Sequence, residues 1–263
     1  VKAGLRPIVA IYSTFLQRSQ DSLIHDVALQ RQHVILGLDR AGLVGADGAT
    51  HNGVFDISYL GHIPDTVIAS PIDEWEMEQM LELAVDYPRI FAIRYPRGNV
   101  PRLFDELPHV PFKIGEAQVL REGHDAAILS LGTMLENALK AHDLLKQEGV
   151  EVRVVNMRFA RPLDGPAIIE SLGRNRLLFT LEEHVLTGGF GSKVLEFLER
   201  SDLEDVIVKR LALPDEFIEQ GSREVQFERF GLSPERIAQR VLETLRSHRS
   251  HALISPDRGP VKS

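Results

Sequence analysis

A glycine-rich segment at residues 39–53 contains the densest group of side chains that could take part in chemistry. Its sequence is Asp39-Arg-Ala-Gly-Leu-Val-Gly-Ala-Asp-Gly-Ala-Thr-His-Asn-Gly53, which includes Arg40, Asp47 and His51. Glycines allow a backbone to bend around a ligand, although the glycines and Asp47 could equally form ordinary turns. Ala46-Asp47-Gly48 resembles the start of a diphosphate–magnesium motif, but its first glycine is replaced by Ala46 and no Asn-Asn pair follows. We therefore assign no metal ligands here.

Two further segments carry groups suited to binding. In Arg94-Tyr-Pro-Arg-Gly-Asn99, two arginines lie beside a rigid proline and a permissive glycine. A guanidinium binds a phosphate or carboxylate in bidentate fashion, although a solvated surface turn would have the same composition. In Tyr12-Ser-Thr-Phe-Leu-Gln-Arg18, Phe15 and Arg18 could clamp a flat ring if Thr14 caps a helix there. The alternative places Phe15 in the core.

The sequence gives less support for a site in its second half. Glu182-Glu183-His184 precedes Gly188-Gly189-Phe-Gly191, and a glycine-rich helix start could bind an anion through free N–H groups. Close packing of the helix on a strand would explain the glycines equally well. The ten histidines have no ligand-like spacing on a predicted helix and there is no cysteine, so we predict no metal site.

Short apolar runs alternate with segments of helical period, which predicts an α/β fold with parallel strands. In the first half, strands are expected at 8–12, 33–39, 66–70 and 90–95, with helices at 16–30 and 73–85 between them. In the second half, strands are expected at 126–131, 151–156, 177–181 and 206–211, with helices at 133–147, 189–198 and 234–245. If these strands form, Arg40, His51 and Arg97 lie at one edge of one sheet, where open α/β sheets bind ligands.

Three prolines at Pro101, Pro108 and Pro111 interrupt the periodic pattern, which indicates a domain linker. We therefore expect two doubly wound domains at residues 1–112 and 113–246, followed by a tail at 247–263 that lacks periodicity and is predicted to be disordered. Asp73 and Glu76 predict a capped helix start, as do Thr133 and Glu136.

Composition excludes several classes of protein. The chain has 263 residues, 43% of them hydrophobic and 26% charged, which is typical of a soluble globular protein. Its net charge of -8 argues against an extended nucleic-acid surface, and no apolar stretch approaches the roughly 18–20 residues that span a bilayer. The absence of cysteine excludes disulfides and a thiol nucleophile. We therefore expect neither a nucleic-acid partner nor a membrane partner.

Several motifs together resemble the 1-deoxy-D-xylulose-5-phosphate synthase family, which consists of thiamine-diphosphate enzymes of the transketolase superfamily. The resemblance covers nearly the whole chain up to Arg246. It is carried by Ile11-Tyr-Ser-Thr-Phe-Leu-Gln-Arg18, Asp39-Arg-Ala-Gly-Leu-Val-Gly-Ala-Asp-Gly48 with Thr50-His51, Phe55-Asp-Ile-Ser-Tyr-Leu60, Arg94-Tyr-Pro-Arg-Gly98, Asn156-Met-Arg-Phe-Ala-Arg-Pro-Leu-Asp164 and Leu213-Pro-Asp-Glu-Phe-Ile218.

The resemblance implies a partial pyrimidine-binding domain followed by a transketolase C-terminal-type domain. It also implies condensation of pyruvate with D-glyceraldehyde 3-phosphate to 1-deoxy-D-xylulose 5-phosphate and CO2, in the non-mevalonate isoprenoid pathway. The implied site residues are Phe15 and Arg18 at the cofactor's aminopyrimidine, Tyr12, Arg40 and Arg97 at the acceptor phosphate, and Asp47 and His51 as catalytic residues near the reacting carbon.

Two parts of the family's site have no counterpart in this chain. These are the magnesium–diphosphate motif and the glutamate that activates the aminopyrimidine. The implied partners are therefore the missing N-terminal diphosphate-binding portion and, for the complete enzyme, a second copy in a homodimer. A cytoplasmic or plastid location is expected. We also expect the chain alone to be inactive and not to bind thiamine diphosphate at micromolar concentration.

Two alternatives remain open at this point. The chain could be the β-type subunit of another two-chain thiamine enzyme, such as a split transketolase or a pyruvate dehydrogenase, although such a subunit normally contains its own activating glutamate. It could also be a catalytically silent binding module that kept the fold. A silent module has no physical need for Arg40, Asp47, His51 and Arg97 together, which argues against that reading.

Overall fold

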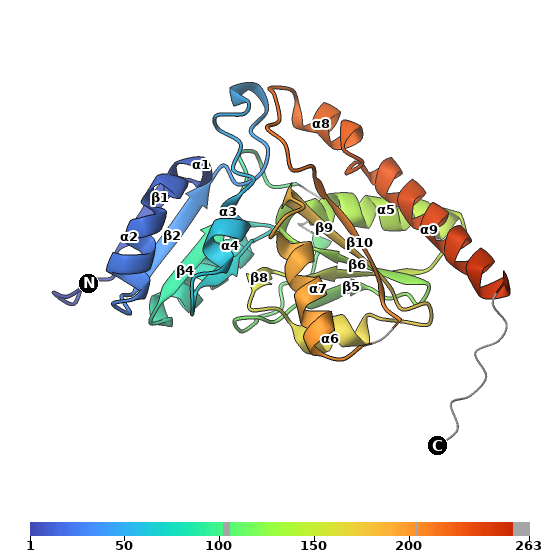
Figure 1. The fold of residues 1–263 in the computed structure, drawn as a ribbon, viewed down its shortest axis with the longest axis horizontal. Coiled ribbons are helices and arrows are strands. Elements are labelled where there is room, and N and C mark those ends of the chain that lie inside the picture. The colour runs from blue at the N-terminus through green and yellow to red at the C-terminus, as the bar shows by residue number, and fades with distance from the viewer. Residues whose placement is uncertain (102–105, 204, 255–263) are drawn as a thin grey trace, which may run out of the picture.

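Two five-stranded sheets lie beside each other, each with helices packed against it (Figure 1). The computed structural model describes residues 1–101, 106–203 and 205–254. The predicted α/β architecture with two doubly wound units is confirmed. Each sheet also contains one antiparallel strand, which the sequence did not predict.

The first sheet has the strand order β1-β2-β4-β3-β8. Its strands are β1 (Ile8–Tyr12), β2 (Val34–Asp39), β3 (Val67–Ala69), β4 (Ile90–Arg94) and β8 (Phe159–Arg161). The first four are parallel, with Tyr12 paired to Asp39 and Leu38 paired to Arg94. This register places the carboxyl ends of β1, β2 and β4 at one edge.

The second sheet has the order β10-β9-β6-β7-β5. Its strands are β5 (Gln118–Arg121), β6 (Ala126–Ser130), β7 (Val152–Asn156), β9 (Leu177–Val185) and β10 (Ile207–Leu213). Only β5 is antiparallel to its neighbour. The helices of this half are α5 (Leu135–Gln147), α6 (Gly165–Glu170), α7 (Phe190–Arg200), α8 (Arg223–Arg229) and α9 (Pro234–Ile254).

The helix predicted at 16–30 is not a regular α-helix. The chain forms α1 (Ser13–Leu16), a 3-10 turn (Gln17–Ser19), α2 (Gln20–Ser22) and a π-helical turn (Leu23–Ala28). In the last of these, Leu29 N donates to Ile24 O and Gln32 N donates to Val27 O, which widens the helix. Hydrophobic spacing does not distinguish these helix types. The other helices of this half are α3 (Asp56–Gly61) and α4 (Glu74–Asp86).

One of the three predicted helix caps is confirmed. Asp73 accepts a hydrogen bond from Glu76 N at 2.8 Å, although the Glu76 carboxylate accepts from Ile72 N and not from Asp73. Thr133 lies inside a 3-10 turn before α5 and caps nothing. Thr14 also lies inside its helix, and its hydroxyl donates to Thr50 O at 3.3 Å. Both predictions were wrong because each helix starts one or two residues away from the expected position.

The two halves of the chain are interlocked. The second half supplies β8 to the first sheet, and one apolar cluster joins Leu38 and Ile57 of the first half to Leu129 and Phe190 of the second. Residues 102–105 of the predicted linker lie outside the described residues. The predicted tail differs from the structure over residues 247–254, which continue α9, while residues 255–263 lie outside the described residues. Within the described chain, no helix is long and apolar enough to cross a membrane.

Candidate active site

The predicted site residues lie along the carboxyl edge of the first sheet. Tyr12 ends β1, Arg40 directly follows β2, and Arg97 lies three residues after β4. The loop after β2 continues through Asp47 and His51 before α3 begins, beside the segment that precedes α8 (Figure 1). Arg40, His51 and Arg97 therefore lie in loops that leave the same edge of the sheet, as the predicted strand ends indicated.

Five of the seven predicted residues form a continuous cluster of rings and guanidinium groups. The Phe15 ring stacks on Tyr12 at 5.2 Å and meets the edge of His51 at 5.4 Å. The Arg40 guanidinium lies 3.9 Å from the Tyr12 ring centroid, and that of Arg18 lies 5.8 Å from the Phe15 centroid. These contacts bring β1, α1 and the loop after β2 together in space.

Arg40 is held in an unusual conformation. Its backbone φ is +60°, and its guanidinium pairs with the neighbouring Asp39. Within the described residues, its Nε is buried without a hydrogen-bond partner. A buried donor without a partner is costly, so Arg40 Nε is an unsatisfied donor at this edge of the sheet.

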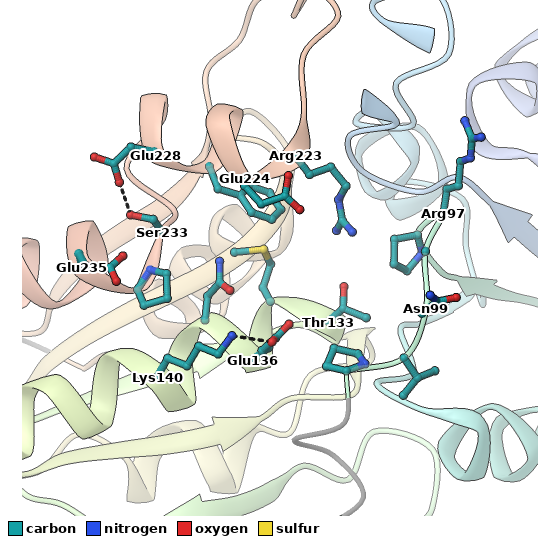
Figure 2. Close-up of a pocket in the computed structure, with 18 residues that line it drawn as sticks. Arg97, Asn99, Thr133, Glu136, Lys140, Arg223, Glu224, Glu228, Ser233 and Glu235 are labelled. Atoms are coloured by element: carbon teal, nitrogen blue, oxygen red, sulfur yellow. Dashed lines mark hydrogen bonds and ion pairs between the residues drawn. The ribbon is translucent and has the colours of Figure 1, made fainter. Parts of the chain in front are cut away.

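The remaining two predicted residues form a separate pair. Arg97 Nη1 lies 2.9 Å from Asp47 Oδ2, and both side chains are partly exposed. Arg97 also lines a cavity of about 890 Å³ between the loop after β4 and the starts of α5, α8 and α9 (Figure 2). In the described part of the chain, none of the other six predicted residues lines this cavity.

The cluster fits a flat cofactor ring better than it fits a metal ion. Phe15 lies among other rings, but 36% of its surface is exposed. An exposed ring face is what stacking on a flat cofactor ring requires. This exposure argues against the alternative that Phe15 is a core residue. Among the described residues, no group of three or more His, Asp or Glu side chains could hold a metal ion.

Sequence reasoning missed a buried polar network behind these residues. Asp56, fully buried at the start of α3, accepts a hydrogen bond from Ser13 Oγ at 3.1 Å and from Arg94 Nε at 3.1 and 3.2 Å. Arg94 Nη2 also donates to Glu183 O on β9 at 3.2 Å. Tyr59 OH donates to Ser13 O at 2.7 Å. The sequence contains no local signal for these contacts because their partners are more than thirty residues apart.

The glycine-rich start of α7 does not offer a free anion site. Glu182, which is fully buried, accepts hydrogen bonds from Phe190 N at 2.6 Å and Gly191 N at 2.7 Å. The N–H groups that could have bound an external anion are thus occupied by a carboxylate of the same chain. Burial raises the pKa of the Glu182 carboxyl to about 7, against the opposing effect of these two hydrogen bonds.

Comparisons with known proteins identify the families that this chain resembles. The family model described as "Transketolase, pyrimidine binding domain" matches residues 1–102, and "Transketolase, C-terminal domain" matches residues 115–237. The chain is 46% identical over 253 residues to the 1-deoxy-D-xylulose-5-phosphate synthase of Heliobacterium modesticaldum, with 95% of this chain and 39% of the relative covered. It is 44% identical over 253 residues to that of Desulforudis audaxviator, with 96% of this chain and 40% of the relative covered. The chain thus spans about two-fifths of the length of these relatives.

Solved structures also resemble the chain. A structure titled "Split gene transketolase, inactive beta4 tetramer" superposes with a TM-score of 0.84 at 26% identity, covering 93% of this chain and 78% of that one. The transketolase of Campylobacter jejuni gives a TM-score of 0.72 at 18% identity, covering 90% of this chain and 35% of that one, and this likeness concerns the fold alone.

Proposed function

Since the chain belongs to the 1-deoxy-D-xylulose-5-phosphate synthase family of the transketolase superfamily, we propose that it supplies the acceptor pocket and part of the cofactor's pyrimidine site of such an enzyme. The complete enzyme would condense pyruvate with D-glyceraldehyde 3-phosphate, releasing CO2. Thiamine diphosphate supplies the carbanion chemistry when bound. The observation that supports this role most directly is the convergence of Phe15, Arg40 and His51 at one sheet edge.

Phe15 and Arg18 would hold the aminopyrimidine ring. Phe15 has an exposed ring, and its stacking on Tyr12 at 5.2 Å fixes its plane before a ligand arrives. Ring stacking contributes only about 0.5–1.5 kcal/mol, so these two residues orient the ring and do not anchor the cofactor. The resemblance to the family implies that the diphosphate and its magnesium ion would be bound by the N-terminal portion.

Tyr12, Arg40 and Arg97 would bind the acceptor phosphate. Arg40 has a buried Nε without a partner in the described chain, and the Arg97 side chain is half exposed. Asp47 and His51 would act on the acceptor's hydroxyl and carbonyl groups. His51 Nδ1 lies 2.9 Å from Thr50 Oγ1, a contact that restrains the ring and leaves Nε2 for a ligand.

Other parts of the proposal concern the complete protein. Its partners would be the N-terminal diphosphate-binding portion and a second copy in a homodimer, and its location would be cytoplasmic. The likeness to the split-gene transketolase, of which this chain covers 78%, favours a second candidate, namely the β-type subunit of a two-chain enzyme. The mass of the native protein separates the two: a product near 29.5 kDa supports the split form, and one more than twice as heavy supports the single chain.

Replacing Arg97 by alanine in the complete enzyme tests the acceptor pocket. Loss of a charged hydrogen bond costs roughly 1.5–3 kcal/mol, so kcat/KM for D-glyceraldehyde 3-phosphate should fall about tenfold to a hundredfold. Arg89→Ala is the matched control, because Arg89 immediately precedes β4 at the opposite end of that strand. Steady-state kinetics in which both variants leave the acceptor kcat/KM at the wild-type value would contradict the assignment.

A further inference from the structure

Two adjacent glutamates on β9 face different neighbours. Glu182 and Glu183 are both buried, with 0% and 4% of their surface exposed. Successive side chains of a strand point to opposite faces, so Glu182 meets the start of α7 while Glu183 meets the loop after β2. A buried carboxylate is retained only where it has strong partners.

Glu183 contacts the loop directly. Its Oε1 accepts a hydrogen bond from Leu43 N at 2.8 Å, and its carboxylate binds Arg223 through Nε at 3.1 Å and Nη2 at 2.6 Å. A Cβ added to Gly42 would lie 2.5 Å from Glu183 Cδ, and Gly42 has a φ of +89°. Gly42 is therefore the residue that allows the carboxylate to approach the loop so closely.

Other contacts also hold the loop after β2 to the second half of the chain. Asn52 Oδ1 accepts from Val44 N at 3.1 Å, and Asn52 Nδ2 donates to Ile218 O at 2.9 Å. Gly221 N donates to Gly45 O at 3.1 Å. Among these contacts, the hydrogen bond from Leu43 N to Glu183 is the one that involves a charged side chain. Arg223, the ion-pair partner of Glu183, lies at the start of α8 (Figure 2).

We infer that Glu183, fixed by Arg223, is a positioning residue that holds residues 41–53 in place and thereby sets the positions of Asp47 and His51 for the acceptor substrate. This inference rests on the proposed function, because that function gives Asp47 and His51 their role. The second half of the chain would thus contribute to acceptor binding through Glu183, which lies on β9.

Amide hydrogen exchange on this chain tests the contact without any assumption about the reaction. Glu183→Met removes the acceptor of the Leu43 N–H, so exchange at Leu43 should rise about tenfold or more. Glu183→Gln keeps one acceptor oxygen and should give an intermediate increase. Glu182→Gln is the matched control on the same strand, and it should leave Leu43 at the wild-type rate. An unchanged Leu43 rate in both Glu183 variants would overturn the inference.

Kinetics of the complete enzyme test the consequence for the acceptor. Glu183→Gln should raise KM for D-glyceraldehyde 3-phosphate about threefold to tenfold while KM for pyruvate stays within about twofold, and Glu182→Gln should change neither. A merely structural role would move both KM values or the amount of folded enzyme. Equal changes in both KM values, or no change in either, would refute the positioning role. If Arg97→Ala also leaves the acceptor kcat/KM unchanged, the proposed function itself fails; if it lowers that value, only the inference fails.

Discussion

Replacing His184 by asparagine should make the folded protein more resistant to acid. His184 is fully buried at the end of β9, where Nδ1 lies 2.8 Å from Val185 O and Nε2 accepts from Ser58 N at 3.4 Å. Both contacts are compatible with a neutral ring that is protonated on Nδ1 only. Burial lowers the pKa of His184 to about 4 from its ordinary value of 6.5. The negative charge of Asp56 opposes this shift, and the positive charge of Arg94 adds to it.

The sign and size of the effect follow from proton linkage. Below pH 6.5 the unfolded chain takes up a proton at this histidine, whereas the folded chain stays neutral until about pH 4. The contribution of His184 is therefore complete above pH 6.5 and is lost as the pH falls. The loss amounts to about 2 kcal/mol at pH 5 and approaches about 3 kcal/mol near pH 4. Asparagine can donate to the same carbonyl and does not titrate.

Urea unfolding of wild type and His184→Asn at several pH values measures this term. The variant is expected to be less stable near neutral pH, because it loses the contact with Ser58. The difference between the two proteins should shrink by about 2 kcal/mol between pH 7.5 and pH 5. Titrating groups far from His184 are present in both proteins and cancel in the comparison. Parallel stability curves over this range would refute the assignment of a neutral buried His184.

Three further outcomes are expected. Burial raises the folded-state pKa of Glu182 from its ordinary value of 4.5 to about 7, so the stabilisation from its protonation is complete below pH 4.5 and is lost as the pH rises through 7. Glu182→Gln should therefore flatten a decline in urea stability between about pH 4.5 and pH 7. Arg158 Nε lies 2.6 Å from Glu76 Oε1, so Arg158→Met leaves a buried carboxylate without its charge partner. This substitution should lower the free energy of unfolding in urea by about 3–5 kcal/mol. The control Lys140→Met, which breaks an exposed pair with Glu136, should lower it by about 0.5 kcal/mol. Isothermal titration of this chain with thiamine diphosphate and magnesium should detect no binding at micromolar concentration. Stacking alone cannot supply the roughly 8 kcal/mol that such affinity requires. A micromolar Kd would show that the chain contains more of the cofactor site than proposed.

The parts of the fold that could be predicted from sequence are those encoded locally. β1 was predicted with its observed bounds, and β2 and β4 within one residue, because each is a short apolar run followed by a polar segment. Those strand ends determine where Tyr12, Arg40 and Arg97 emerge. Asp73 was recognised as a cap because its partner Glu76 lies only three residues away. The roles assigned to the seven site residues remain proposals.

Features that depend on distant partners could not be predicted. β8 joins the first sheet by pairing with β3, about ninety residues earlier, and its three residues carry no strand signal of their own. The predicted strand ends place the loops of Arg97 and Asp47 at one edge of the sheet, but sequence alone does not indicate that these two side chains pair. Glu182 and Glu183 look alike in the sequence, but the opposite faces of β9 give them unrelated partners.

The buried charges explain how exposed site residues can keep a fixed geometry. Asp56, Arg94 and Glu183 form a chain of contacts from the β1–α1 turn to the second sheet, with no more than 4% of any of them exposed. Breaking one such pair would leave an uncompensated buried charge at a cost of about 3–5 kcal/mol, a large part of the 5–15 kcal/mol that stabilises a typical domain. The turn carrying Phe15 and the loop carrying His51 are therefore held through buried partners behind them. These buried contacts act together with the ring contacts of Phe15 with Tyr12 and His51 in holding the turn and the loop at this edge of the sheet.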